Sequence, residues 1–284
     1  MKTPTKAIIA DAGFASRYLP ITKTIPKSML PFGNRPIMQL LVEECIEAGI
    51  EEIIIVATAE GRPIYEDYFN NSVNHIRKQL IAQGKEDRYE AVQHVLDFPK
   101  ITVIEQDPSL PYGTAAPIIS ARDYLSDDEA FITMQADDVV FGPGDVKTLI
   151  ESYEKHPDAK GIMIAQEVDP SVVNKYGIIV LKNGDQLDYI VEKPAVDAAP
   201  SNLASYGRFL HTPEIFKHFD ETGLDDELWQ VDGVTKMAKD GAVYVEKTRG
   251  QWMTTGDPKN YFLAHLRFNL DSEDWRDEIR ELVG

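Results

Sequence analysis

The sequence contains a single cysteine, Cys45, among its 284 residues. One cysteine cannot form an internal disulfide, so the chain is not a disulfide-stabilised scaffold. The residues around it, 42–46, have the spacing of a helix with one apolar side, which favours a buried structural thiol over a nucleophile. The six histidines show none of the spacings of metal ligands, and we assign them no catalytic role.

Basic residues are also scarce, because 29 lysines and arginines face 47 aspartates and glutamates, for a net charge of −18. Such a field repels nucleic acid and anionic membrane surfaces, so binding to either is disfavoured. No apolar run approaches the ~18 residues needed to span a bilayer, and residues 1–6 lack the apolar stretch of a signal peptide. We therefore expect a cytoplasmic protein with no nucleic-acid or membrane partner.

The first half of the chain alternates short apolar runs with helical patterns. The apolar runs are typical of buried strands and cover 6–11, 51–57, 101–105 and 130–135. The helical patterns cover 36–49, 114–124 and 143–154. This alternation predicts crossover units and a mostly parallel sheet with helices on both faces. The expected fold is α/β, doubly wound and Rossmann-like.

The second half has a different pattern. A polar segment at 70–98 predicts one or two inserted amphipathic helices, acting as a surface decoration or a subunit contact. Beyond residue 160, strands joined by turn signals predict a mixed sheet, and the last residues predict a closing C-terminal helix. We expect one domain over 1–284, divided into 1–158, 159–268 and the helix 269–284.

Three cations follow the first predicted strand: Arg17, Lys23 and Lys27. They lie within eleven residues at the carboxyl edge of the sheet, where α/β proteins bind ligands. Backbone N–H groups and basic side chains can hold a phosphate there, although the turn matches neither the P-loop nor the dinucleotide fingerprint. From these residues alone, a phosphate site and a solvated basic loop remain equally open.

The segments around these cations, 12–20 and 22–31, resemble the nucleotide-binding signature of the bacterial UTP–glucose-1-phosphate uridylyltransferases. Further segments resemble the same family in the same order, namely Gln106 with 111–115, then 136–138, 175–177, 191–194, 201–208 and 226–232. The insert at 70–98 is similar to the one that separates the uridylyl from the thymidylyl enzymes. Together these motifs favour UTP and glucose 1-phosphate as substrates.

The resemblance implies the nucleotide-diphospho-sugar transferase fold, transfer of a uridylyl group that yields UDP-glucose and pyrophosphate, Mg²⁺ as cofactor, and a homodimer or homotetramer. It implies that the triphosphate and the departing pyrophosphate are stabilised by Arg17 and Lys27. It places the nucleotide on Ala12, Gly13, Gln106, Gly113 and Asp137. Asp137 is also the expected metal ligand. The sugar phosphate is expected on Gly177, Glu192 and Lys193.

Each of these residues also has a simpler explanation. Asp137 with Asp138 could merely end a strand, and Glu192 could pair with Lys193 on the surface. Gly113 could permit a turn at a helix start, although a missing side chain also lets a nucleobase lie close to the backbone.

Three positions depart from the family pattern. Ala15 replaces the usual second glycine of the signature, Ser28 stands where the uridylyl subgroup usually has glutamate, and Thr254 stands where a second metal-binding aspartate is expected. Asp257 could be a substitute ligand, with a surface turn acid as the simpler explanation. These departures keep two alternatives open: a catalytically impaired relative that modulates an active subunit, or a nucleotidyltransferase for another base or sugar.

Overall fold

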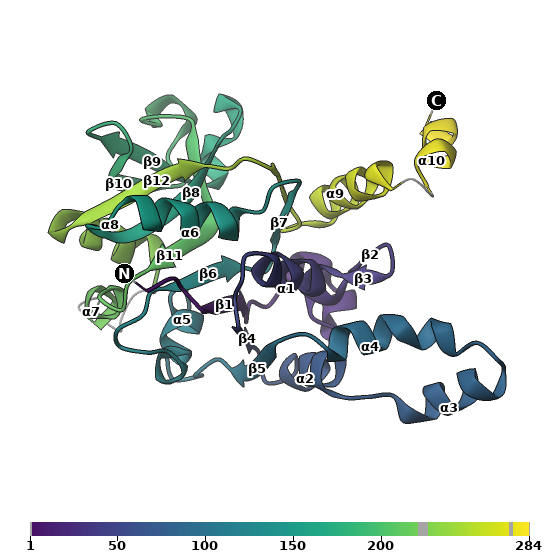
Figure 1. Cartoon of the computed structure of the whole chain (residues 1–284). Coiled ribbons are helices and arrows are strands. Elements are labelled where there is room, and N and C mark those ends of the chain that lie inside the picture. The colour runs from purple at the N-terminus through teal and green to yellow at the C-terminus, as the bar shows by residue number, and fades with distance from the viewer. Residues whose placement is uncertain (1, 221–226, 273–274, 284) are drawn as a thin grey trace.

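The computed structural model describes residues 2–220, 227–272 and 275–283. Among these residues, nine strands form one mixed sheet in the order β5-β4-β1-β6-β11-β8-β12-β10-β9 (Figure 1). The strands of this sheet are β1 (Lys6–Asp11), β4 (Glu52–Ala57), β5 (Lys100–Glu105), β6 (Phe131–Gln135), β8 (Ala159–Glu167), β9 (Gly177–Lys182), β10 (Gln186–Glu192), β11 (Leu203–His211) and β12 (Ala242–Lys247).

The strands of the first half are parallel, as their apolar runs predict. β1 lies between β4 and β6, so that Ala7 pairs with Ile53 on one side and with Ile132 on the other. Residues 7–10 are buried throughout, because helices cover both faces of this part of the sheet.

Helices on the two faces form two apolar clusters. One cluster contains side chains from α1 (Ile37–Glu47), α2 (Arg62–Asn70), α6 (Asp145–Lys155) and α9 (Pro258–Asp271). The other contains side chains from α5 (Ala116–Ser120), α7 (Ile215–Asp220) and α8 (Gln230–Asp240). Cys45 is buried in the first cluster, with its Sγ 3.2 Å from Sδ of Met134, in agreement with the predicted structural thiol.

The two halves share the sheet, because β11 pairs antiparallel with β6 and places Phe209 opposite Thr133. Two small ribbons flank this junction. One pairs β7 (Asp138–Phe141) with β13 (Gln251–Thr254), which sets Thr254 beside Asp138. The other pairs β2 (Pro31–Phe32) with β3 (Arg35–Pro36). The second half is mixed in direction, as predicted.

The predicted insert contains two helices, α3 (Asn74–Ala82) and α4 (Glu90–Leu96), which extend outward beyond α2 (Figure 1). The single closing helix expected at 269–284 is instead two helices, α9 (Pro258–Asp271) and α10 (Arg276–Val283). The first begins earlier than predicted because Asp257 caps it. In the described residues, no helix combines the length and the apolar character needed to cross a bilayer.

Candidate active site

Two adjoining cavities open at the carboxyl edge of the parallel strands. The smaller cavity, of about 260 Å³, is lined by residues that follow β1, β5 and β6. The larger cavity, of about 570 Å³, is lined mainly by the second half of the chain. The residues that line both are Thr114, Gln135, Asp137 and Trp229. A ligand in one cavity therefore lies next to a ligand in the other, with Asp137 at the boundary.

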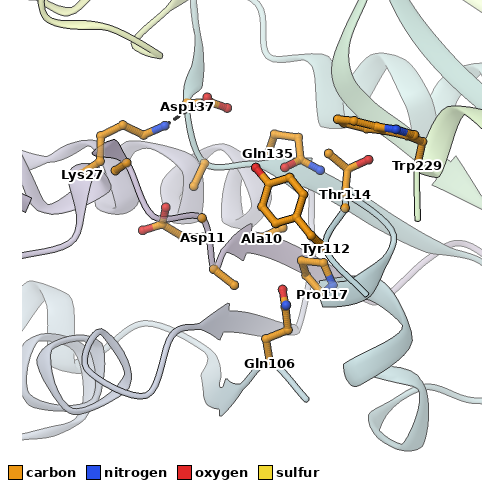
Figure 2. Close-up of a pocket in the computed structure, with 15 residues that line it drawn as sticks. Ala10, Asp11, Lys27, Gln106, Tyr112, Thr114, Pro117, Gln135, Asp137 and Trp229 are labelled. Carbon is orange, nitrogen blue, oxygen red and sulfur yellow. Dashed lines mark ion pairs between the residues drawn. The ribbon is translucent and has the colours of Figure 1, made fainter. Parts of the chain in front are cut away.

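The smaller cavity collects the residues that the sequence assigned to the nucleotide. Its lining includes Ala12, Gly13, Gln106, Gly113, Asp137 and Lys27. A Cβ added at Gly13 would meet no atom within 4 Å, so this backbone is open to a ligand. Figure 2 shows Gln106, Tyr112 and Pro117 on one side of this space and Lys27 on the other.

Gly113 has a structural role that the sequence did not reveal. Its φ is +149°, and an added Cβ would lie 2.2 Å from the carbonyl oxygen of Leu228. The neighbouring N–H of Ala115 donates to the same oxygen at 2.9 Å. Close packing of the 112–115 loop on Leu228 therefore requires a glycine here, while the same residue also lines the smaller cavity.

The larger cavity collects the residues that the sequence assigned to the sugar phosphate, together with Arg17. Its lining includes Arg17, Gly177, Glu192 and Lys193. The Nζ of Lys193 lies 3.0 Å from Oε1 of Glu192 and 5.0 Å from the ring centroid of Trp229. The simpler surface pairing of Glu192 with Lys193 is therefore present, but it faces the cavity.

The backbone of Lys193 is in the left-handed region, with a φ of 45°. A non-glycine residue in this conformation stores strain, which is concentrated at functional sites. The side chain of Arg17 donates a hydrogen bond from its Nη1 to the carbonyl oxygen of Gly256 at 3.3 Å. Arg17 thus lines the larger cavity and Lys27 the smaller one, and Asp137 borders both.

Lys27 and Asp137 form an ion pair, with Nζ 3.0 Å from Oδ2 (Figure 2). Burial opposes the charge on Asp137, but the ammonium of Lys27 outweighs it, so the pKa of Asp137 is lowered. Burial likewise opposes the charge on Lys27, and the carboxylates of Asp137 and Asp11 outweigh it, so its pKa is raised. Both groups are therefore ionised at neutral pH.

Thr254, the residue that departs from the expected metal site, lies beside Asp137. Its Oγ1 is 3.4 Å from the carbonyl oxygen of Asp137. A Cβ added at Gly256 would lie 3.3 Å from that Oγ1 and 3.4 Å from Oδ2 of Asp137, so both side chains border one point. Among the residues that the structure describes, no three His, Cys, Asp or Glu side chains gather as a ready-made metal centre.

Asp257 serves as the N-cap of α9. Its Oδ1 accepts hydrogen bonds from the backbone N–H groups of Lys259 and Asn260 at 3.1 and 3.0 Å, and its Oδ2 accepts one from Nδ2 of Asn260. These contacts occupy the carboxylate in helix capping. They favour the structural explanation of Asp257 over its use as a substitute metal ligand.

Several lining residues were not singled out individually from the sequence. Trp229 belongs to the predicted sugar-facing segment 226–232, whose first residue, Asp226, lies outside the described residues. Tyr112 belongs to the predicted segment 111–115, and Gln135 ends the predicted strand 130–135. Side chains of this kind become recognisable once the loops that carry them are placed together.

Residues 6–269 match the family model described as nucleotidyl transferase. The chain belongs to this family. It is 35% identical over 290 residues to UTP–glucose-1-phosphate uridylyltransferase 2 of Staphylococcus saprophyticus, covering 100% of this chain and 98% of that protein. It is 37% identical over 268 residues to the UTP–glucose-1-phosphate uridylyltransferase of Pseudomonas aeruginosa, covering 91% of this chain and 94% of that protein.

Solved structures give the same result for the fold. A UTP-bound UGPase from Acinetobacter baumannii superimposes with a TM-score of 0.87 at 26% identity, covering 99% of this chain and 98% of that chain. A UDP-glucose pyrophosphorylase complexed with UDP-glucose superimposes with a TM-score of 0.80 at 30% identity, covering 93% and 98%. The predicted α/β fold and the resemblance found in the sequence are therefore confirmed.

Proposed function

We propose that this chain transfers the uridylyl group of UTP to glucose 1-phosphate, with UDP-glucose and pyrophosphate as products. The observation that carries the proposal is the junction of the two cavities at Asp137, in a chain that matches uridylyltransferases over its whole length. UTP occupies the smaller cavity and glucose 1-phosphate the larger one. A phosphate oxygen of the sugar attacks the α-phosphorus, and the bond from that phosphorus to the β-phosphate oxygen breaks.

The protein contributes position and charge, because this reaction needs no covalent intermediate. Lys27 and Arg17 stabilise the charge of the triphosphate and of the departing pyrophosphate from the two sides of Asp137. Lys193 orients the attacking phosphate, and Glu192 accepts hydrogen bonds from sugar hydroxyls. The backbone at Ala12 and Gly13, with Gln106 and the loop of Gly113, receives the base and ribose.

Mg²⁺ suits the oxygen donors at the junction of the cavities. Asp137 offers a carboxylate that is 38% exposed, and Mg²⁺ commonly binds through one or two carboxylates, with substrate phosphates and waters completing its shell. When bound, the ion neutralises charge on the phosphate oxygens. The hydroxyl of Thr254 at the same point is neutral, and we therefore expect weak metal affinity and slow turnover.

We further propose that the protein is a cytoplasmic homo-oligomer, a dimer or a tetramer. UTP is available in the cytoplasm, which supports a cytoplasmic location. The exposed insert of α3 and α4 offers a surface for contact between subunits. The second candidate function is a binding-only relative that modulates an active subunit. The departures at Ala15, Ser28 and Thr254 favour it.

The deciding experiment measures pyrophosphate release and UDP-glucose formation from the purified chain with UTP, glucose 1-phosphate and Mg²⁺ or Mn²⁺. We expect both products in equal amounts, with slower turnover in Lys27→Ala and unchanged turnover in Lys78→Ala, a matched change on the exposed insert. The same assay with other nucleoside triphosphates and other sugar 1-phosphates tests the preference for uracil as the base and for glucose as the sugar. Binding of UTP without product under any of these conditions would instead establish the binding-only relative.

A further inference from the structure

Arg208 ends the segment 201–208 that resembles the family, yet the reaction described above gives it no role. Its side chain is fully buried, so it does not contact a substrate directly. Arg208 belongs to β11 and pairs with Met134, one residue before the end of β6. A buried guanidinium is stable only when its N–H groups and its charge have partners, so those partners indicate what the residue holds in place.

The guanidinium of Arg208 binds two backbone carbonyl groups. Its Nη1 donates to the carbonyl oxygen of Gln135 at 3.2 Å, and its Nη2 donates to that of Asp138 at 2.5 Å. Gln135 ends β6, and Asp138 begins β7 in a separate ribbon. The chain leaves the large sheet between these two strands, and the arginine supplies donors to the carbonyl groups on either side of the exit. Only residues 136 and 137 lie between them, and the second is Asp137.

Thr255 holds the same connection through a different atom. It is fully buried, and its backbone N–H and its Oγ1 donate to the carbonyl oxygen of Asp137 at 2.6 and 3.0 Å. The carbonyl oxygens of residues 135, 137 and 138 therefore all accept hydrogen bonds from the second half of the chain. These contacts fix the backbone of Asp137, while its carboxylate borders both cavities.

The charge of Arg208 is balanced by a carboxylate other than Asp137. Its Nη2 lies 3.4 Å from Oε2 of Glu44, a residue of α1. The other oxygen of Glu44 accepts hydrogen bonds from the backbone N–H groups of Asp145 and Val146 in the first turn of α6, at 2.9 and 3.2 Å. The ion pair and the two carbonyl contacts thus use different partners, and mutation can remove the first without the second.

We infer that Arg208 is a positioning residue, which fixes the connection 136–137 and through it the carboxylate of Asp137 at the junction of the cavities. The inference rests on the proposed function, because it assigns Asp137 to the nucleotide and to Mg²⁺. A planar guanidinium suits this role, because its fork of donors holds two carbonyl groups at a set separation. Exact placement matters, since a displacement of about 1 Å near the reacting atoms can slow an enzyme by about 100-fold.

The first test compares Arg208→Met with Glu44→Gln. Both variants remove the ion pair, but only Arg208→Met also removes the donors to the two carbonyl groups. Arg208→Met should lower kcat by about 10- to 100-fold, the range for loss of a group that orients a metal ligand. Glu44→Gln should lower the free energy of unfolding and keep the wild-type kcat. An equal loss of kcat in both folded variants would overturn the inference, because general destabilisation would then explain it.

The second test measures metal binding without turnover. Mn²⁺ is titrated into each protein with UTP present and no sugar phosphate, and free Mn²⁺ is followed by electron paramagnetic resonance. Arg208→Met should raise the Kd for Mn²⁺ by about 10- to 100-fold, and Glu44→Gln should leave it unchanged. A wild-type Kd in folded Arg208→Met would overturn the inference. A wild type that binds UTP and Mn²⁺ but forms no product would contradict the proposed function alone.

The third test guards against a failure to fold, because Arg208→Met leaves the carboxylate of Glu44 buried without its partner. Glu44→Met combined with Arg208→Met removes both charges, and replacing a buried ion pair by apolar residues is often neutral or stabilising. Thermal unfolding shows whether this double variant is folded. It should lose kcat and Mn²⁺ affinity as Arg208→Met does, because it lacks the same two donors. A folded double variant with wild-type kcat and Mn²⁺ affinity would overturn the inference.

Discussion

Ala15 combines a departure from the signature with an unfavourable backbone. Its φ and ψ are 44° and 40°, in the left-handed region, where a Cβ costs about 1–2 kcal/mol. We therefore expect Ala15→Gly to raise the free energy of unfolding by about 1 kcal/mol, less the added entropy of glycine in the unfolded chain. Denaturant unfolding checks this value. A loss of stability would show that the loop is unstrained.

Lys193 lines the larger cavity and not the smaller one. We therefore expect Lys193→Ala to lower kcat strongly while leaving the affinity for UTP nearly unchanged, because we propose that its charge contacts the sugar phosphate. Steady-state kinetics and calorimetry with UTP measure the two effects. An equal loss of UTP affinity would place Lys193 on the triphosphate instead.

Thr254 tests the metal site. Its hydroxyl borders the same point as the carboxylate of Asp137, so Thr254→Asp brings a second hard oxygen ligand to Mg²⁺. The variant should need less Mg²⁺ for half-maximal rate and should turn over faster than wild type. Titration of the rate with Mg²⁺ provides the measurement. Unchanged metal dependence and rate in an active wild type would show that the site is not damaged at this position.

At the scale of elements, His211 of β11 joins the sheet to α8. Its Nε2 lies 2.9 Å from Nε2 of Gln230, while its Nδ1 is buried without a partner. Burial lowers the pKa of His211 from 6.5 to about 3. The folded state therefore resists protonation, and the unfolded chain binds the extra proton below pH 6.5.

This difference sets the direction of the pH dependence. The contribution of His211 to the free energy of unfolding is fully present above pH 6.5 and is lost as the pH falls toward 3. The loss between pH 6.5 and pH 5 is about 2 kcal/mol. His211→Phe should remove this part of the acid sensitivity, although it also removes the contact with Gln230. Urea unfolding at the two pH values gives the comparison, and an equal decline in both proteins would exclude His211 as its source.

Elements with strong periodicity were predictable from the sequence. Residues 7–10 form a continuous apolar run, because β1 is buried on both faces, and the insert shows helical spacing. In contrast, α9 was missed, because its buried residues, Ala264 and Asn269, give little apolar periodicity. Its start signal, Asp257 followed by proline, was present in the sequence, but we considered that aspartate only as a ligand or a surface acid.

The candidate site was predictable in part, because some of its residues lie in local sequence patterns. Arg17 and Lys27 lie close in sequence to a strand end, and the resemblance supplied the more distant residues. The contacts of Arg208 were not predicted, because its partners Gln135 and Asp138 come from separate elements that only the fold brings together. The roles of the predicted residues remain predictions.

At the scale of the whole molecule, one continuous sheet brings the two halves together. β6 ends beside Asp137, and its pairing with β11 connects the half that lines the smaller cavity to the half that lines the larger one. The net charge of −18 opposes both anionic substrates, so the few cations at the junction must neutralise them locally. This arrangement favours a complex in which both substrates are bound before any bond breaks.

The same arrangement predicts a kinetic signature. Cys45 and His211 are buried away from the junction, and burial raises the pKa of the thiol and lowers that of the imidazole, so neither is a ready nucleophile. Without a covalent uridylyl-enzyme, labelled pyrophosphate should not exchange into UTP unless the sugar substrate is present. We expect exchange only when UDP-glucose or glucose 1-phosphate is added, and intersecting initial-rate plots in the forward direction. Exchange with UTP and pyrophosphate alone would demonstrate a protein nucleophile and would contradict direct in-line transfer between the two cavities.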